Sequence, residues 1–486
     1  MGKNHKFSRR QFLKDSSCAA MGSMALYSSI INLGMLNTLA ARPHIIDNTS
    51  DYKAIVCILL AGGCDTYNVL VPTETSEYSE YVNTRGTLAL DLNGSPAEIL
   101  ELDYDDNGRT FGVHAGMSEV KDMFDNGDLS FISNIGTLVE PIYTAQEYHD
   151  KIKQRPLGLY SHSDQIMQWQ TSVPTDRSAI GFAGRMADIL HDMNTIPEVS
   201  MNISLSGKNR FQTGNQYPEY SISRNATENN IGYDGFPSWW SNSGFLNDLK
   251  ASTINSAAEQ QYSNVLQSTI GSITNQTSES IEIYKAALGN VVPLTTPFSD
   301  TNLSNDLKKI AELMQVRSHL GHNRQVFFVT YGGWDHHDEL INNQNAKLPV
   351  VSKALSEFNA ALSEIGVKDD VITFTISDFA RTLTSNGNGS DHAWGGNQMI
   401  MGGPITGGQI FGNYPSLNLE SILNVSNRGN LIPTTSVDEF YAEIALWYGV
   451  SPNDLDYVLP NLCNFYDSSN CTVPPASDFA PIGMFG

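Results

Sequence analysis

Aspartate and histidine recur just after the short apolar runs of this sequence. The five that we single out are Asp65, Asp335, His337, Asp378 and His392. Carboxylates gathered in one crevice repel one another unless a cation or shared protons neutralise them. A mixture of Asp and His suits zinc, manganese or iron better than calcium, which prefers oxygen ligands throughout. The joint pattern of Asp and His at several strand ends therefore predicts a divalent metal site, with zinc as the first candidate, and a purely hydrogen-bonded polar site is the alternative.

Three further residues are candidates for catalysis. Thr66 could supply a nucleophilic hydroxyl or a metal ligand, although a β-branched hydroxyl at such a turn is more often a helix cap. Arg381 could clamp an anion through two hydrogen bonds, or pair with a nearby acid. His162 lies in the segment Ser161-His162-Ser163-Asp164, which adds another His/Asp pair. A Ser/His/Asp hydrolase built on this segment is less favoured, because adjacent side chains rarely point at one another and no Gly-x-Ser-x-Gly elbow occurs.

The elements that must position these residues are short apolar runs alternating with helical patterns. The runs are continuous rather than alternating, which is typical of parallel strands buried on both faces. They span residues 54–60, 129–135, 199–205, 325–330, 371–376 and 398–401, and the helical patterns span 117–124, 180–193, 348–365 and 437–448. We therefore expect a three-layer α/β/α sandwich with a mostly parallel central sheet. Ligands of such sheets bind beyond the carboxyl ends of the strands, where the candidate residues stand.

The segment 208–300 departs from this alternation. It is rich in Asn, Ser and Gly and contains Trp239-Trp240. We interpret it as a cap inserted in one α/β domain that spans residues 41–486, with a separate small domain as the alternative.

The N-terminal residues predict export from the cytoplasm. Ser8-Arg9-Arg10-Gln11-Phe12-Leu13-Lys14 precedes a weakly apolar stretch, residues 18–39, that carries too many polar groups for a stable membrane span. This order is typical of a twin-arginine signal peptide over residues 1–40, so the Tat translocase is the expected partner during export. The mature protein is then periplasmic or secreted. In that oxidising compartment Cys463 and Cys471 form a disulfide or remain two free thiols.

The overall charge excludes some partners. The sequence has 29 basic and 52 acidic residues, for a formal net charge of −23. Such a balance argues against a nucleic acid or an anionic membrane surface as a partner. An anionic substrate would need a local cation to hold it.

The whole mature chain resembles the domain-of-unknown-function family 1501 (DUF1501), a group of Tat-exported bacterial proteins distantly similar to the alkaline phosphatase and sulfatase superfamily. Besides the Arg-Arg signal, the segments that carry the resemblance are Leu60-Ala61-Gly62-Gly63-Cys64-Asp65, Ser161-His162-Ser163-Asp164, Gly332-Gly333-Trp334-Asp335-His336-His337, Ser377-Asp378-Phe379-Ala380-Arg381-Thr382, Asp391-His392-Ala393-Trp394-Gly395 and Ile432-Pro433-Thr434-Thr435-Ser436. The resemblance implies an alkaline phosphatase-like fold with Asp65 as the first metal carboxylate.

The same resemblance implies that Asp335, His337, Asp378 and His392 are the later ligands. This chain departs from phosphatases at Phe379, where they usually have His, and from the family at Asp378, where Glu is usual. The implied function is that of an exported metal-dependent hydrolase of phosphate or sulfate esters. The alternative is a non-catalytic periplasmic binding or scaffold protein that keeps the fold.

Overall fold

The computed structural model describes residues 51–217, 219–227, 280–466, 475 and 479–485. All of them belong to one unit, Asp51–Gly486. The predicted signal peptide, Trp239-Trp240 and Cys471 lie outside the described residues, as does the middle of the predicted cap, 228–279. Cys463 is disulfide-bonded.

The core of the molecule is a nine-stranded sheet with the order β11-β5-β10-β9-β1-β8-β6-β7, in which β12 also pairs with β5. Its strands are β1 (Lys53–Leu60), β5 (Leu129–Gly136), β6 (Asn202–Ser204), β7 (Tyr220–Ser221), β8 (Arg324–Thr330), β9 (Val371–Ser377), β10 (Gly396–Met401), β11 (Ile410–Phe411) and β12 (Thr435–Ser436). All pairings are parallel except those of β10, which runs antiparallel to β5 and β9. The largely parallel sheet confirms the predicted fold class. Because β10 runs antiparallel to β9, the start of β10 lies at the same end of the sheet as the carboxyl end of β9.

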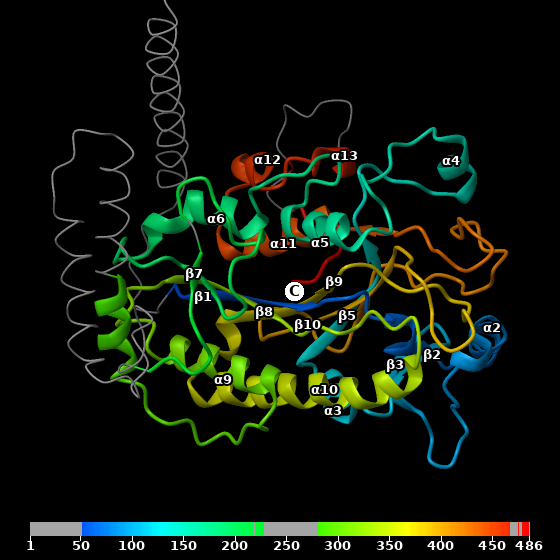
Figure 1. Ribbon diagram of the computed structural model, residues 1–486, viewed down its shortest axis with the longest axis horizontal. Coiled ribbons are helices and arrows are strands. Elements are labelled where there is room, and N and C mark those ends of the chain that lie inside the picture. The colour runs from blue at the N-terminus through cyan, green and yellow to red at the C-terminus, as the bar shows by residue number, and fades with distance from the viewer. Residues whose placement is uncertain (1–50, 218, 228–279, 467–474, 476–478, 486) are drawn as a thin grey trace, which may run out of the picture. The chain divides into compact units, whose positions relative to one another are not determined.

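Both faces of the sheet are buried, which explains the continuous apolar runs. Along β1, residues such as Val56 and Ile58 pack into one hydrophobic cluster, whereas Ile55 and Cys57 pack into the other. Helices α3 (Ser118–Asp125), α9 (Asn302–Gln315) and α10 (Leu340–Glu364) cover the first face, and α5 (His162–Thr171), α6 (Phe182–Leu190), α11 (Val437–Tyr448) and α12 (Leu455–Val458) cover the second (Figure 1).

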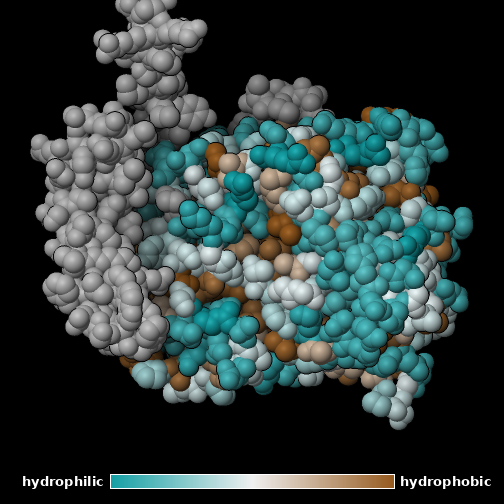
Figure 2. Space-filling view, viewed as in Figure 1, coloured by the Kyte–Doolittle hydropathy of each residue, from teal (hydrophilic) through white to brown (hydrophobic). Residues whose placement is uncertain are grey.

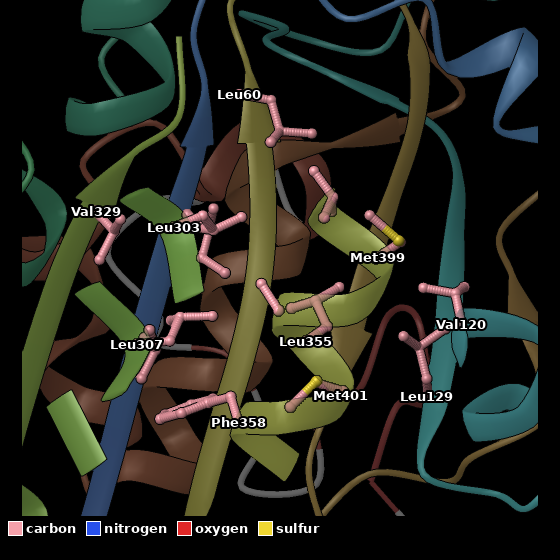
Figure 3. Packing of buried hydrophobic residues seen from close by; sticks show 14 of the residues in the cluster. Leu60, Val120, Leu129, Leu303, Leu307, Val329, Leu355, Phe358, Met399 and Met401 are labelled. Atoms are coloured by element: carbon pink, nitrogen blue, oxygen red, sulfur yellow. The ribbon is translucent and has the colours of Figure 1, made fainter. Parts of the chain in front are cut away.

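Figure 3 shows part of the first face, where Leu303 and Leu307 of α9 and Leu355 and Phe358 of α10 lie against the sheet. The helical patterns predicted α3, α6 and α11 to within a few residues. They also predicted α10, but this helix begins at Leu340, eight residues before the expected start, and continues through Pro349. A capping box between Ser436 and Glu439 opens α11.

A second, three-stranded sheet lies beside the first sheet and was not predicted. It consists of β2 (Leu70–Pro72), β4 (Arg109–His114) and β3 (Ile99–Asp106), and α2 (Thr75–Arg85) follows β2. The remaining helices are short: α4 (Ala145–Asp150), α13 (Cys463–Tyr466) and the 3-10 turns η1 (Thr66–Asn68), η2 (Gly86–Leu88), η3 (His191–Met193), η4 (Lys368–Asp370) and η5 (Pro452–Asp454).

The face of the molecule seen in Figure 2 is mainly hydrophilic. In the view of Figure 2, hydrophilic residues cover most of the described part, and hydrophobic residues form scattered patches. Within the described ranges, none of the helices has both the length and the apolarity needed to cross a membrane.

Candidate metal centre

The loops that follow β1, β8 and β9 meet at one edge of the central sheet, together with the loop that enters β10. Their close approach depends on Gly62, which has a positive φ of 122°. A Cβ at Gly62 would lie 2.5 Å from the backbone nitrogen of Asp335. Only glycine allows the two backbones to touch here. The Gly62 N–H in turn donates a hydrogen bond to Asp378 Oδ1 at 2.9 Å.

Three side chains from these loops and from the start of α5 form a group that could hold a metal ion. They are His162, Asp335 and His392, whose ligand atoms all lie within 4.8 Å of one another. His162 Nε2 is 3.5 Å from Asp335 Oδ2, and His392 Nε2 is 3.4 Å from Asp335 Oδ1. Tetrahedral zinc with bonds of about 2.0–2.1 Å separates its ligands by about 3.3 Å. The spacing therefore fits a tetrahedral ion.

His337 stands next to this group without belonging to it. Its Nε2 is 3.0 Å from His392 Nε2 and 3.1 Å from Asp335 Oδ1. The side chain of His337 is 45% exposed, as is that of Asp335, so both are open to solvent.

The three histidines share one orientation, because each has its Nδ1 tied to an oxygen. His162 Nδ1 bonds Asp378 Oδ2 at 2.6 Å, and His337 Nδ1 bonds Asp391 Oδ1 at 3.0 Å. His392 Nδ1 bonds the backbone oxygen of Tyr160 at 2.8 Å. Ionised carboxylates and carbonyls only accept hydrogen bonds, so in the neutral rings the proton is on Nδ1 and the lone pair is on Nε2. This arrangement of acceptors behind histidines is the one that metal ligands use.

The result is a convergence of electron pairs. The Nε2 atoms of His162, His337 and His392 each lie 3.1 to 3.5 Å from an oxygen of the Asp335 carboxylate. Such an arrangement is repulsive unless protons or a cation lie between the groups. The residues present therefore fit a divalent ion with nitrogen and oxygen ligands, for which zinc is suited.

Asp378, predicted as a ligand, lies behind His162. Its side chain is 1% exposed, and its two oxygens accept from His162 Nδ1 and from the Gly62 N–H. With both oxygens engaged, Asp378 orients the histidine rather than facing the centre of the group.

Asp65 and Thr66, predicted as a ligand and a nucleophile, are also placed outside the group. Asp65 Oδ2 pairs with Arg85 of α2 at 2.5 Å, and both side chains are fully buried. Among the described residues Asp65 Oδ1 has no hydrogen-bond partner. Thr66 is 3% exposed, and its Oγ1 accepts the Asn397 N–H at 2.8 Å. The hydroxyl of Thr66 is thus held against β10 and has little access to solvent.

Arg381, predicted as an anion clamp, is fully buried. Its Nη1 donates to Asp335 Oδ1 at 2.6 Å and to the backbone oxygen of Gly62 at 3.3 Å. Its other donors reach the hydroxyl and the backbone oxygen of Ser390. The structure therefore favours the second sequence alternative, a pair with a nearby acid.

The floor of the group is apolar. Phe379 is 2% exposed, and its ring centroid is 4.8 Å from that of His162 and 4.4 Å from that of His392. Burial lowers the pKa of His392. Burial raises the pKa of Asp335, but the hydrogen bond and charge of Arg381 outweigh it and leave that pKa below its ordinary value.

Two residues of this arrangement were missed in the sequence. Asp391 had a signal, because it directly precedes His392, but nothing local connected it with His337, 54 positions away. Arg85 lies in α2, whose sequence carries no sign that one of its side chains reaches the end of β1.

Comparisons with known proteins agree with the resemblance seen in the sequence. Residues 241–455 match the family model described as "Protein of unknown function (DUF1501)". We found no match to this chain among curated proteins.

Solved structures similar to the chain include sulfatases and an alkaline phosphatase. PsFucS1 sulfatase from Pseudoalteromonas sp. is 9% identical, with a TM-score of 0.33, over 87% of this chain and 71% of that one. The alkaline phosphatase of the Antarctic bacterium TAB5 is 9% identical, with a TM-score of 0.24, over 74% of this chain and 93% of that one. Likeness at this level supports no statement about the site.

Proposed function

We propose that His162, Asp335 and His392 hold a divalent metal ion, zinc first among the candidates, and that the site hydrolyses phosphate or sulfate esters. The observation that carries the proposal is the shared orientation of the histidines. Each Nδ1 is held by an oxygen, so that the Nε2 lone pairs converge on the carboxylate of Asp335. With each ring proton on Nδ1, the histidines themselves offer no hydrogen-bond donor to the carboxylate of Asp335.

The chain supplies positioning and access. The three proposed ligands leave a fourth position open, as in catalytic zinc sites, and His337 Nε2 stands beside the group, 3.0 Å from His392 Nε2. When bound, the ion would polarise the ester and make water a stronger nucleophile at neutral pH. Asp335 is 45% exposed and His162 is 34% exposed, so substrate can approach from solvent. Because the Thr66 hydroxyl is buried, water rather than Thr66 is the nucleophile in this proposal.

One observation favours the second candidate function, a metal-holding protein without turnover. Arg381 is buried and already paired, so it cannot hold an anionic ester at the open side of the site. Arg428 is 35% exposed, but it pairs with Asp391.

Metal content and ester cleavage, measured together, separate these functions. The purified mature protein is stripped with a chelator, reloaded with zinc and tested on generic phosphate and sulfate esters. We expect one ion per chain in the wild type and in the control variant His149→Ala, whose histidine is exposed on α4, and loss of the ion in His392→Ala. Zinc without cleavage would support the binding protein, and failure to retain zinc would reject both functions.

Export by the Tat translocase belongs to the same proposal and rests on the sequence of residues 8–14. Replacing both Arg9 and Arg10 by Lys should keep the protein in the cytoplasm, as measured by cell fractionation. Periplasmic or secreted protein from that double variant would contradict this route.

A further inference from the structure

We propose that Arg381 is a positioning residue that occupies one oxygen of Asp335, so that the carboxylate meets the metal through its other oxygen only. This inference rests on the proposed function, because it assigns the geometry of the same ion. It gives Arg381 a role different from the anion clamp suggested by its sequence.

The contacts of Arg381 connect the loops that carry the site. Nη1 bonds Asp335 Oδ1 in the loop after β8 at 2.6 Å and the Gly62 oxygen in the loop after β1 at 3.3 Å. Nε bonds Ser390 Oγ at 3.3 Å, in the segment that leads to His392. A planar guanidinium presents donors in several fixed directions, which an ammonium group cannot do.

The burial of this guanidinium is unusual enough to require compensation. Arg381 is fully buried, whereas its acidic partner Asp335 is 45% exposed. A buried charge is costly and is retained where a charged partner and further acceptors satisfy it. The acceptors here are the carboxylate, two backbone oxygens and one hydroxyl.

The position of the two carboxylate oxygens then decides the coordination. Both oxygens face histidines of the site: Oδ1 lies 3.4 Å from His392 Nε2, and Oδ2 lies 3.5 Å from His162 Nε2. Oδ1 also accepts the Arg381 bond at 2.6 Å, so Oδ2 is the oxygen that Arg381 leaves free for the ion. A carboxylate with both oxygens free can chelate a metal and fill a position that substrate needs. With Arg381 on Oδ1, Asp335 contributes one oxygen and the fourth position stays open.

Cobalt is the probe that reports this geometry, because four-coordinate Co²⁺ absorbs visible light much more strongly than five- or six-coordinate Co²⁺. We compare wild type with Arg381→Lys, which keeps the positive charge and loses the fork. In the variant we expect weaker visible absorbance per bound cobalt and zinc affinity about 10- to 100-fold lower, the usual effect of losing an outer partner of a metal ligand.

The matched control is Arg185→Lys. Arg185 is also buried and donates to backbone oxygens, among them those of Val458 and Ile180, away from the group. This variant should keep the wild-type cobalt spectrum and zinc affinity. A change equal to that of Arg381→Lys would reduce the effect to general loss of packing and overturn the proposal.

A milder variant covers the case in which Arg381→Lys does not fold. Ser390→Ala removes only the acceptor of the Arg381 Nε–H, so it should shift the cobalt spectrum in the same direction by a smaller amount. If wild type binds no cobalt, the proposed function and this inference fail together. If wild type binds cobalt and both site variants keep its spectrum, only the positioning role fails.

Discussion

Asp378→Asn tests the orientation of His162 with a change of one atom. The carboxylate accepts two hydrogen bonds, from His162 Nδ1 at 2.6 Å and from the Gly62 N–H at 2.9 Å. An asparagine side chain has one acceptor oxygen and one NH₂ donor. If the oxygen serves Gly62, the NH₂ faces His162 Nδ1, and the ring proton must move to Nε2. His162 then has no lone pair for a metal.

The expected magnitude follows from the bond that is lost. A hydrogen bond to a charged group contributes about 1.5–3 kcal/mol. At about 1.4 kcal/mol per tenfold change, zinc affinity should fall about 10- to 100-fold. The assay is a competition titration between the protein and a chromophoric zinc chelator.

Asp164→Asn is the matched control for this prediction. Asp164 lies on α5 two residues after His162, is also buried, and pairs with Arg177 at 2.9 Å. It should lower stability without changing zinc affinity. Wild-type affinity in Asp378→Asn, with a folded protein, would refute the reasoning about the histidine lone pair.

Three more predictions concern stability. Burial lowers the pKa of His322 from 6.5 to about 3, so between these pH values the unfolded chain binds more protons than the folded chain. Below pH 6.5 this group should therefore lower the free energy of unfolding by about 1.4 kcal/mol per pH unit. His322→Gln should flatten that slope, as measured by urea titrations at several pH values. Burial raises the pKa of Asp438 from 3.8 to about 7, so the folded protein loses stability as the pH rises across that range. Asp438→Asn removes the buried charge, and the Ser172 hydroxyl can turn to accept a hydrogen bond from the new amide. At pH 8 this variant should be up to about 4 kcal/mol more stable than wild type, and equal stability would count against a buried charge. Gly62→Ala should destabilise the folded protein by about 3 kcal/mol or more, because the alanine Cβ would lie 2.5 Å from the backbone nitrogen of Asp335. A thermal unfolding curve like that of wild type would show that the two loops can move apart without cost.

The fold could be predicted from the sequence because its signals are local. β1 and β9 are buried on both faces, so apart from Lys53 their residues are apolar or small. The alternation of such runs with helices favours a parallel sheet between helical layers. The gathering of Asp335 and His392 followed from the rule that ligands bind beyond the strand ends.

The roles within the site could not be predicted, because they depend on competition between distant groups. Asp65 and Asp378 both follow strands, as Asp335 does. Asp65 meets Arg85, and Asp378 meets a histidine 216 positions away. The spacing of residues along the sequence indicates neither pairing, because each depends on which side chain the folded loops bring nearest to the carboxylate.

The pairing of β1 has a consequence for synthesis. Its neighbours in the sheet are β8 and β9, where Ile55 lies opposite Val326 and Ile372. At about 5–20 residues per second, a ribosome needs on the order of 15–60 s to make the chain between β1 and these partners. During that interval the seven apolar residues that follow Lys53 in β1 lack both of the strands that flank them in the sheet. We therefore expect chaperones to hold the nascent chain, and fragments that stop before residue 371 to aggregate.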